Sequence, residues 1–162
     1  MISPNSKIRA TLKLFCFRFL PLIFAFSFAS VAWAQTTYYS YQNGDWEEED
    51  TWTTDPSGTL SINKAVPAPG DFVVLLNGRT VTVNDNDIDV DLVDIQDGAI
   101  LNLGLTTGHN FSTLSGQGIL RLASTVLPTG DKSSFVASTG GTIEYHGGSN
   151  FSFNTDNTFN NL

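Results

Sequence analysis

The sequence predicts an all-β protein, a right-handed parallel β-helix, and three observations support this fold class. A pattern of apolar, polar and apolar residues recurs at 81–83, 101–103, 120–122 and 143–145, with first residues 20, 19 and 23 positions apart. Glycine or Asn-Gly precedes each copy as a turn residue. Strand and turn formers dominate after residue 34, and no amphipathic helix of useful length follows. Repeats near twenty residues with short strands and turns are typical of stacked β-helix coils.

The first element along the chain is an export signal at 1–34. Three basic residues precede a largely apolar run from 14 to 34, which ends in the small-residue pattern Ala32-Trp33-Ala34. This order predicts a cleavable secretory signal peptide. A membrane anchor is the alternative, because the run is nearly long enough to span a bilayer core of about 30 Å. An arginine and a proline inside the run argue against an anchor, so we expect a secreted or outer-surface protein with no membrane span after cleavage.

The mature chain is expected to divide into a cap and a set of coils. Residues 35–70 carry a crowded group of Tyr and Trp, which we interpret as an N-terminal aromatic cap, because the first coil of a β-helix must be covered. Residues 71–162 carry the repeat and are predicted to form the coils. The segment 159–162 resembles the opening of another strand, so we expect the coils to be truncated at the C-terminus.

Within each coil, alternate residues of a strand point to opposite faces. The two apolar residues of each copy are therefore predicted to enter the core, and the polar residue between them to face solvent. A second strand is expected about eight residues earlier, at Val93 and Ile95, at Leu114 and at Phe135. The longest interval is expected to hold a corner loop at 124–134. A β-sandwich is the alternative fold, but it gives no reason for one strand pattern to repeat at a near-constant interval.

The segment 44–83 carries a resemblance to a known group of proteins. Gly44-Asp45-Trp46, Thr51-Trp52-Thr53 and the run from 67 to 83 resemble the N-terminal region of large secreted β-helix proteins of Gram-negative bacteria. Proteins of that kind often end in a type IX sorting domain and act as adhesin-like surface proteins. The same run is weakly similar to the glycine-eight domain of extracellular proteins. The resemblance implies a surface function and supplies no catalytic residues.

Composition excludes one class of partner. Four basic residues lie in 1–34 and no acidic ones, so the mature chain has four basic and sixteen acidic residues, a formal charge of 4 − 16 = −12 over 128 residues. A nucleic-acid partner is not expected, because phosphate binding requires a basic surface. Cys16 is the only cysteine and lies within the predicted signal peptide, where its apolar neighbours make a poor acylation site.

No catalytic constellation is found, and the chain is not expected to be an enzyme. The sequence holds neither a serine elbow nor a zinc-binding helix motif. His109 and His146 each lie beside glycine and are interpreted as solvent-exposed loop residues. Glycoside hydrolysis requires a pair of carboxylates with one acid in an apolar pocket, and nothing in the sequence isolates such a pair.

An acidic stretch at 85–94 gives the first candidate site. Its oxygen ligands suit calcium, and the candidate metal ligands are Asp85, Asp87, Asp89 and Asp91. The EF-hand pattern fails, however, because Val90 and Gln96 occupy the positions of the turn glycine and the distal glutamate. We favour the alternative that this stretch is a strand with one solvent-exposed face. Calcium is the only cofactor that the sequence brings into consideration.

An aromatic group gives the second candidate site. Flat rings with polar edges suit stacking on sugars, and the candidate glycan-binding residues are Tyr39, Tyr41, Trp46 and Trp52. The same rings suit the predicted cap, which we favour. The sequence therefore predicts a non-catalytic secreted or cell-surface β-helix segment with a structural or adhesive role, whose partner is a polysaccharide or cell-surface ligand. The alternative is the N-terminal part of a polysaccharide-degrading β-helix enzyme whose catalytic coils are absent from this chain.

Overall fold

The computed structural model describes residues 35–147, so the predicted signal peptide at 1–34 and the strand expected near 159–162 lie outside the described residues. This part of the chain contains eleven strands and one short 3-10 turn. In chain order they are β1 (Thr37–Ser40), β2 (Gly44–Asp45), η1 (Glu49–Thr51), β3 (Trp52–Thr53), β4 (Phe72–Leu75), β5 (Thr80–Thr82), β6 (Asp89–Ile95), β7 (Ile100–Gly104), β8 (Asn110–Gly116), β9 (Ile119–Leu122), β10 (Thr129–Asp131) and β11 (Thr142–Tyr145). Among the described residues, no helix is long and apolar enough to cross a membrane.

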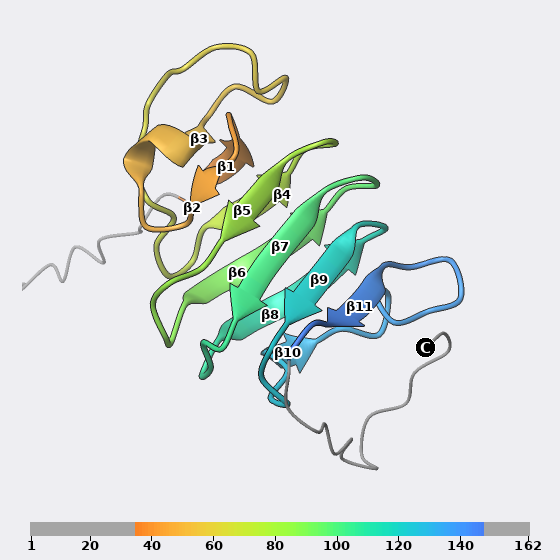
Figure 1. Cartoon of the computed structure of the whole chain (residues 1–162). Helices are drawn as coiled ribbons and strands as arrows, with labels where there is room; N and C mark the ends of the chain where they lie inside the picture. The colour runs from red at the N-terminus through yellow and green to blue at the C-terminus, as the bar shows by residue number, and fades with distance from the viewer. Residues whose placement is uncertain (1–34, 148–162) are drawn as a thin grey trace, which may run out of the picture. The chain divides into compact units, whose positions relative to one another are not determined.

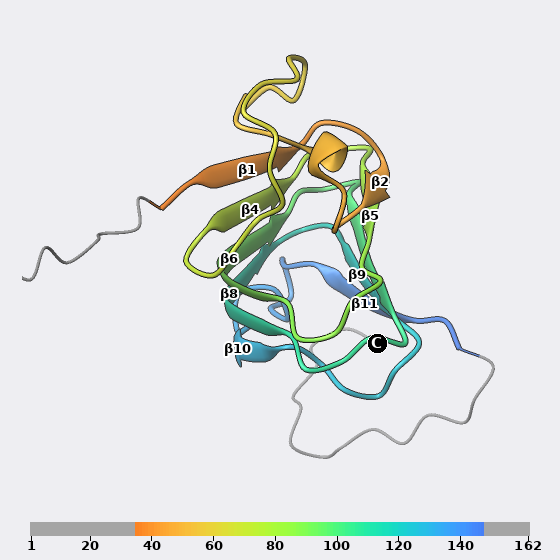
Figure 2. The same ribbon diagram turned by 90° about the vertical axis from the view of Figure 1, so that its left-hand side faces the viewer.

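The strands form a parallel β-solenoid of about four turns. From β4 onwards, successive strands along the chain alternate between two sheets (Figures 1 and 2). The six-stranded sheet has the order β10-β8-β6-β4-β1-β3, and the five-stranded sheet has the order β11-β9-β7-β5-β2. Apart from β1 and β3, which are antiparallel, the paired strands are parallel. A β-sandwich is excluded, because its sheets are built from antiparallel strands.

The predicted repeat is confirmed in the register of the five-stranded sheet. Val81 pairs with Leu101, Leu101 with Leu120, and Leu120 with Ile143. The predicted second strand is also present for two repeats, since Val93 in β6 pairs with Leu114 in β8. Residues one repeat apart therefore stack directly on one another, as coils of a β-helix must.

The third repeat differs from the prediction in two ways. The expected corner loop at 124–134 contains a strand, β10, which pairs in parallel with β8. Phe135 is fully buried as expected but lies in a turn rather than a strand. Its ring occupies the space that a side chain at Gly141 would need, since an added Cβ there would lie 2.2 Å from Phe135 Cε2. Phe135 therefore belongs to the buried core although it is not part of a strand.

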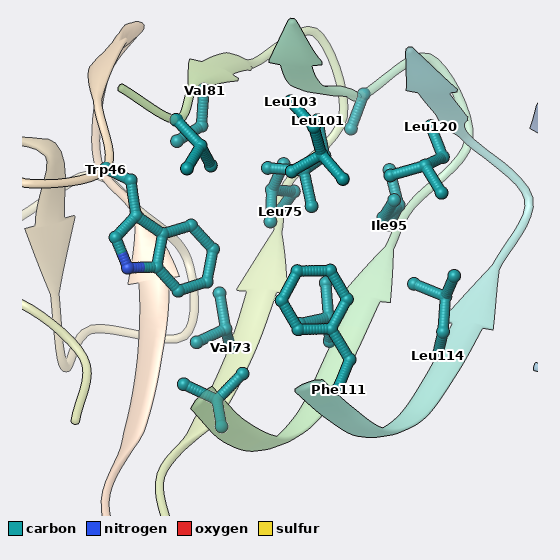
Figure 3. Packing of buried hydrophobic residues seen from close by; sticks show 14 of the residues in the cluster. Trp46, Val73, Leu75, Val81, Ile95, Leu101, Leu103, Phe111, Leu114 and Leu120 are labelled. Atoms are coloured by element: carbon teal, nitrogen blue, oxygen red, sulfur yellow. The ribbon is translucent and has the colours of Figure 1, made fainter. Parts of the chain in front are cut away.

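The core runs along the inside of the solenoid, between the two sheets. Seventeen apolar side chains are buried there. Figure 3 shows 14 of the residues in this cluster, which point inward from both walls. Trp46 and Trp52 lie at the N-terminal end of this core, both with 0% exposure. Their rings meet edge to face with centroids 4.9 Å apart, and Trp52 Nε1 donates a 2.8 Å hydrogen bond to the Trp46 carbonyl. The two rings therefore fill the interior at the end where the first coil begins. The division into a cap at 35–70 and coils at 71–162 stays a prediction.

Candidate ligand-binding faces

A row of outward residues crosses the five-stranded sheet from coil to coil. Backbone pairing places Asp45, Thr82, Asn102, Arg121 and Glu144 side by side on β2, β5, β7, β9 and β11, and we call this row the polar column. Neighbouring strands lie about 4.8 Å apart, so the column presents one side chain at each such step. Thr82, Asn102 and Arg121 alternate with buried residues along their strands. Glu144 lies between Ile143 and Tyr145, which are half-buried and pack against the core, so the four predicted outward residues face away from the core.

Contacts within the polar column order its C-terminal half. Arg121 and Glu144 form a 3.0 Å ion pair, with side chains 29% and 39% exposed. Asn102 Oδ1 accepts a 3.2 Å hydrogen bond from the Gly104 N–H, and His146 Nε2 lies 3.1 Å from the same oxygen. Because that oxygen can only accept, His146 must donate through Nε2–H. The amide oxygen of Asn102 is thereby occupied, whereas its NH₂ group makes no hydrogen bond within residues 35–147.

A second row, with two isoleucines between two threonines, lies beside the polar column on the same face. Thr80, Ile100, Ile119 and Thr142 are paired in register, and we call them the isoleucine column. They lie two residues before the polar column along each strand, a separation of about 7 Å. Both isoleucines are half-buried although they point outward. The outer face therefore combines an apolar strip with a strip of hydrogen-bonding groups.

The six-stranded sheet presents a different outer face. Tyr39 in β1 pairs with Val74, which pairs with Asp94, which pairs with Ser115. Ser115 Oγ donates a 2.8 Å hydrogen bond to Asp94 Oδ1, so these two neighbouring side chains are hydrogen-bonded to each other. This face becomes more polar from the first coil towards the later ones.

The four predicted glycan-binding rings do not share a surface. Tyr39 and Tyr41 are half-buried, whereas Trp46 and Trp52 are fully buried in the core. A fully buried indole has no face free for a sugar ring, so only the two tyrosines of this set lie where a ligand could reach them.

The predicted calcium ligands are exposed but do not converge. Asp89 and Asp91 lie in β6, while Asp85 and Asp87 lie in the corner before it, where Asp87 has a φ of 60°. The stretch is therefore a corner followed by a strand, not one continuous strand. Asp89 Oδ1 already accepts a 2.8 Å hydrogen bond from Asn110 of the next coil. Within residues 35–147, no three His, Cys, Asp or Glu side chains are grouped so that they could hold a metal ion.

His109 is the site residue that sequence reasoning placed wrongly. His146 is exposed as predicted, but His109 is 2% exposed and stacks on Phe111 with centroids 6.0 Å apart. Its Nδ1 accepts a 3.3 Å hydrogen bond from the Ile88 N–H, and its Nε2 lies 3.0 Å from Thr106 Oγ1. The neutral ring therefore joins the corners of two successive coils. Burial lowers the pKa of His109, against a smaller opposite effect of hydrogen bonding at Thr106 and of the Asp87 and Glu47 charges.

A loop between β3 and β4 carries exposed apolar side chains that the sequence did not single out. Leu60, Ile62 and Val66 are 60%, 44% and 39% exposed. The Asp55 carboxylate organises the start of the loop by accepting hydrogen bonds from Ser57, from Thr59 and from the Leu60 N–H. Hydrogen bonding, first from the Ser57 side chain and then from the Leu60 backbone, lowers the pKa of Asp55. The only signal in the sequence was the Asp-Pro-Ser-Gly turn at 55–58.

Comparisons with known proteins add no relative. No protein-family model matches the chain, and no curated protein or solved structure was found to match it.

Proposed function

We propose that the chain is a non-catalytic secreted or cell-surface protein with a structural or adhesive role, and that its outer faces bind an extended extracellular ligand such as a polysaccharide. The observation that carries this proposal is the register of the polar column, which repeats a surface-facing side chain at every strand spacing along the five-stranded sheet. A repeating row of groups suits a ligand that itself repeats. Solenoids use their extended surfaces in this way.

Two further features support the proposal that the chain is secreted or displayed on the cell surface. The order of charged, apolar and small residues in 1–34 is that of a signal peptide. The resemblance of 44–83 to secreted β-helix surface proteins points to the same compartment. A type IX route and an adhesin-like role belong to this proposal as well.

The second candidate function is the N-terminal part of a polysaccharide-degrading enzyme. Arg121, Glu144 and His146 gather on one face, and these residue types serve acid and base chemistry. The carboxylates of the polar column, Asp45 and Glu144, are separated by four strand spacings, about 19 Å. Glycoside hydrolases hold their two carboxyl groups about 5 to 9.5 Å apart, so this face lacks their geometry. We therefore prefer the adhesive function.

One experiment with two readouts tests the proposal. The complete chain is expressed in a Gram-negative host, and the exported product is sequenced from its N-terminus and then applied to a glycan array and to whole bacterial cells. We expect a mature N-terminus at Gln35 and binding to at least one glycan or cell surface. Retention of the intact precursor in the cytoplasm would contradict secretion, and absence of binding on both surfaces would contradict adhesion. Release of new reducing or unsaturated sugar ends would instead favour the enzyme.

A further inference from the structure

We propose that the polar column and the isoleucine column together bind one chain of a neutral polysaccharide, laid across the strands and parallel to the solenoid axis. This inference rests on the proposed function, because it names the ligand class and the face that such a protein would use. The two columns occupy adjacent outward positions of the same four strands, β5, β7, β9 and β11.

The amphipathic pattern of this face matches that of a sugar chain. A pyranose presents C–H groups on its ring faces and hydroxyls at its rim. The half-buried side chains of Ile100 and Ile119 give an apolar strip for the ring faces, and the polar column gives hydrogen-bonding groups about 7 Å away. Ligand sites commonly combine apolar contact area with a few polar groups that fix orientation.

Three groups in the polar column keep hydrogen-bonding capacity. The Thr82 hydroxyl has no hydrogen bond within the described residues, and the Asn102 amide uses its oxygen but neither of its N–H groups. Glu144 engages Arg121 through Oε2, which leaves Oε1 as an acceptor. The column thus offers both donors and acceptors, which the hydroxyls of a neutral sugar can use.

Charge selects a neutral ligand over an acidic one. Arg121 is the only permanent cation of the polar column, and its ion pair with Glu144 neutralises it. Asp45 adds an unpaired negative charge at the other end, on a mature chain of formal charge −12. A uronate or sulfate group would find no unpaired cation among the residues of the polar column and would be repelled by the net negative charge of the chain.

The test is affinity electrophoresis of the exported chain through gels containing hydroxyethyl cellulose, galactomannan or arabinoxylan as neutral probes and polygalacturonate as the acidic probe. We expect retardation by at least one neutral probe and none by polygalacturonate. The isosteric Asn102→Asp and the double variant T82A/N102A remove donors from the column, and each is expected to weaken binding about tenfold. Ser115→Ala is the matched control, since it removes a half-buried outward hydroxyl from the other sheet and is expected to leave binding unchanged.

Several results would overturn the inference. These are preference for polygalacturonate, equal loss of binding in Ser115→Ala, or unchanged binding in Asn102→Asp with its unfolding midpoint preserved. Absence of binding to all three neutral probes also overturns it. If adhesion to cells persists in that last case, the proposed function survives and only this ligand assignment fails.

Discussion

Leu101 stands at the centre of the stacked inward column, and Leu101→Ala tests how strongly one coil holds the next. The side chain is 0% exposed and lies between Val81 and Leu120 of the neighbouring coils. Its replacement by alanine removes three carbon atoms, about 2.4 kcal/mol at roughly 0.8 kcal/mol for each. The cavity left between two fixed neighbours adds about 1 kcal/mol. We therefore expect the free energy of unfolding to fall by about 3 to 4 kcal/mol.

Ile143→Ala is the matched comparison in the same column. Ile143 is half-buried and pairs with Leu120 on one side, so a loss of about 1 to 2 kcal/mol is expected. The assay is urea unfolding of the exported chain followed by far-UV circular dichroism, with the slope of the transition checked for constancy. The reasoning would be refuted if Leu101→Ala destabilised the chain no more than Ile143→Ala.

Three further predictions concern Gly118, His109 and the aspartates of 85–91. Gly118→Ala places a Cβ 2.4 Å from the Gln96 carbonyl oxygen and should cost about 1 to 3 kcal/mol in urea unfolding, whereas an equally stable variant would contradict the close stacking of coils. Burial lowers the pKa of His109 in the folded chain, so the stability contributed by its neutral ring is complete above the ordinary value of 6.5 and is lost as pH falls below it. The urea midpoint of the native chain should therefore decline more steeply with acidification than that of His109→Gln. Equal slopes for the two proteins would disprove this. Because the aspartates of 85–91 do not converge, addition of calcium should leave the thermal midpoint unchanged, and a rise would revive the metal site.

The repeat was predictable because its signal is local. Apolar residues on both sides of one polar residue define the inward face of a short strand, and the near-constant interval identifies the stacking partner. The pairing of Val81, Leu101, Leu120 and Ile143 followed directly from those two features. β10 gave no such signal, because Thr129-Gly130-Asp131 contains no apolar residue and is held by backbone pairing to β8.

The candidate face was predictable in its residues but not in its contacts. Period-two alternation assigned Thr82, Asn102, Arg121 and Glu144 to the outside. The ion pair of Arg121 and the contact of His146 with Asn102 depend on stacking across coils, 23 and 44 residues apart in sequence. His109 was misplaced for a related reason: its glycine neighbour indicates a turn, while its burial depends on Phe111 and on the preceding coil.

The most direct test of the stacked register is a disulfide between adjacent rungs of the polar column. Thr82 and Asn102 pair on β5 and β7, so their Cα atoms should lie within the range of about 4.4 to 6.8 Å that a disulfide spans. The pair T82C/N102C is made in a Cys16→Ser background, which contains no other cysteine. We predict rapid intramolecular oxidation of this pair, and none of T82C/S115C, whose second cysteine lies on the other sheet. Oxidation of the second pair but not the first would contradict the solenoid register and the ligand-binding face built on it.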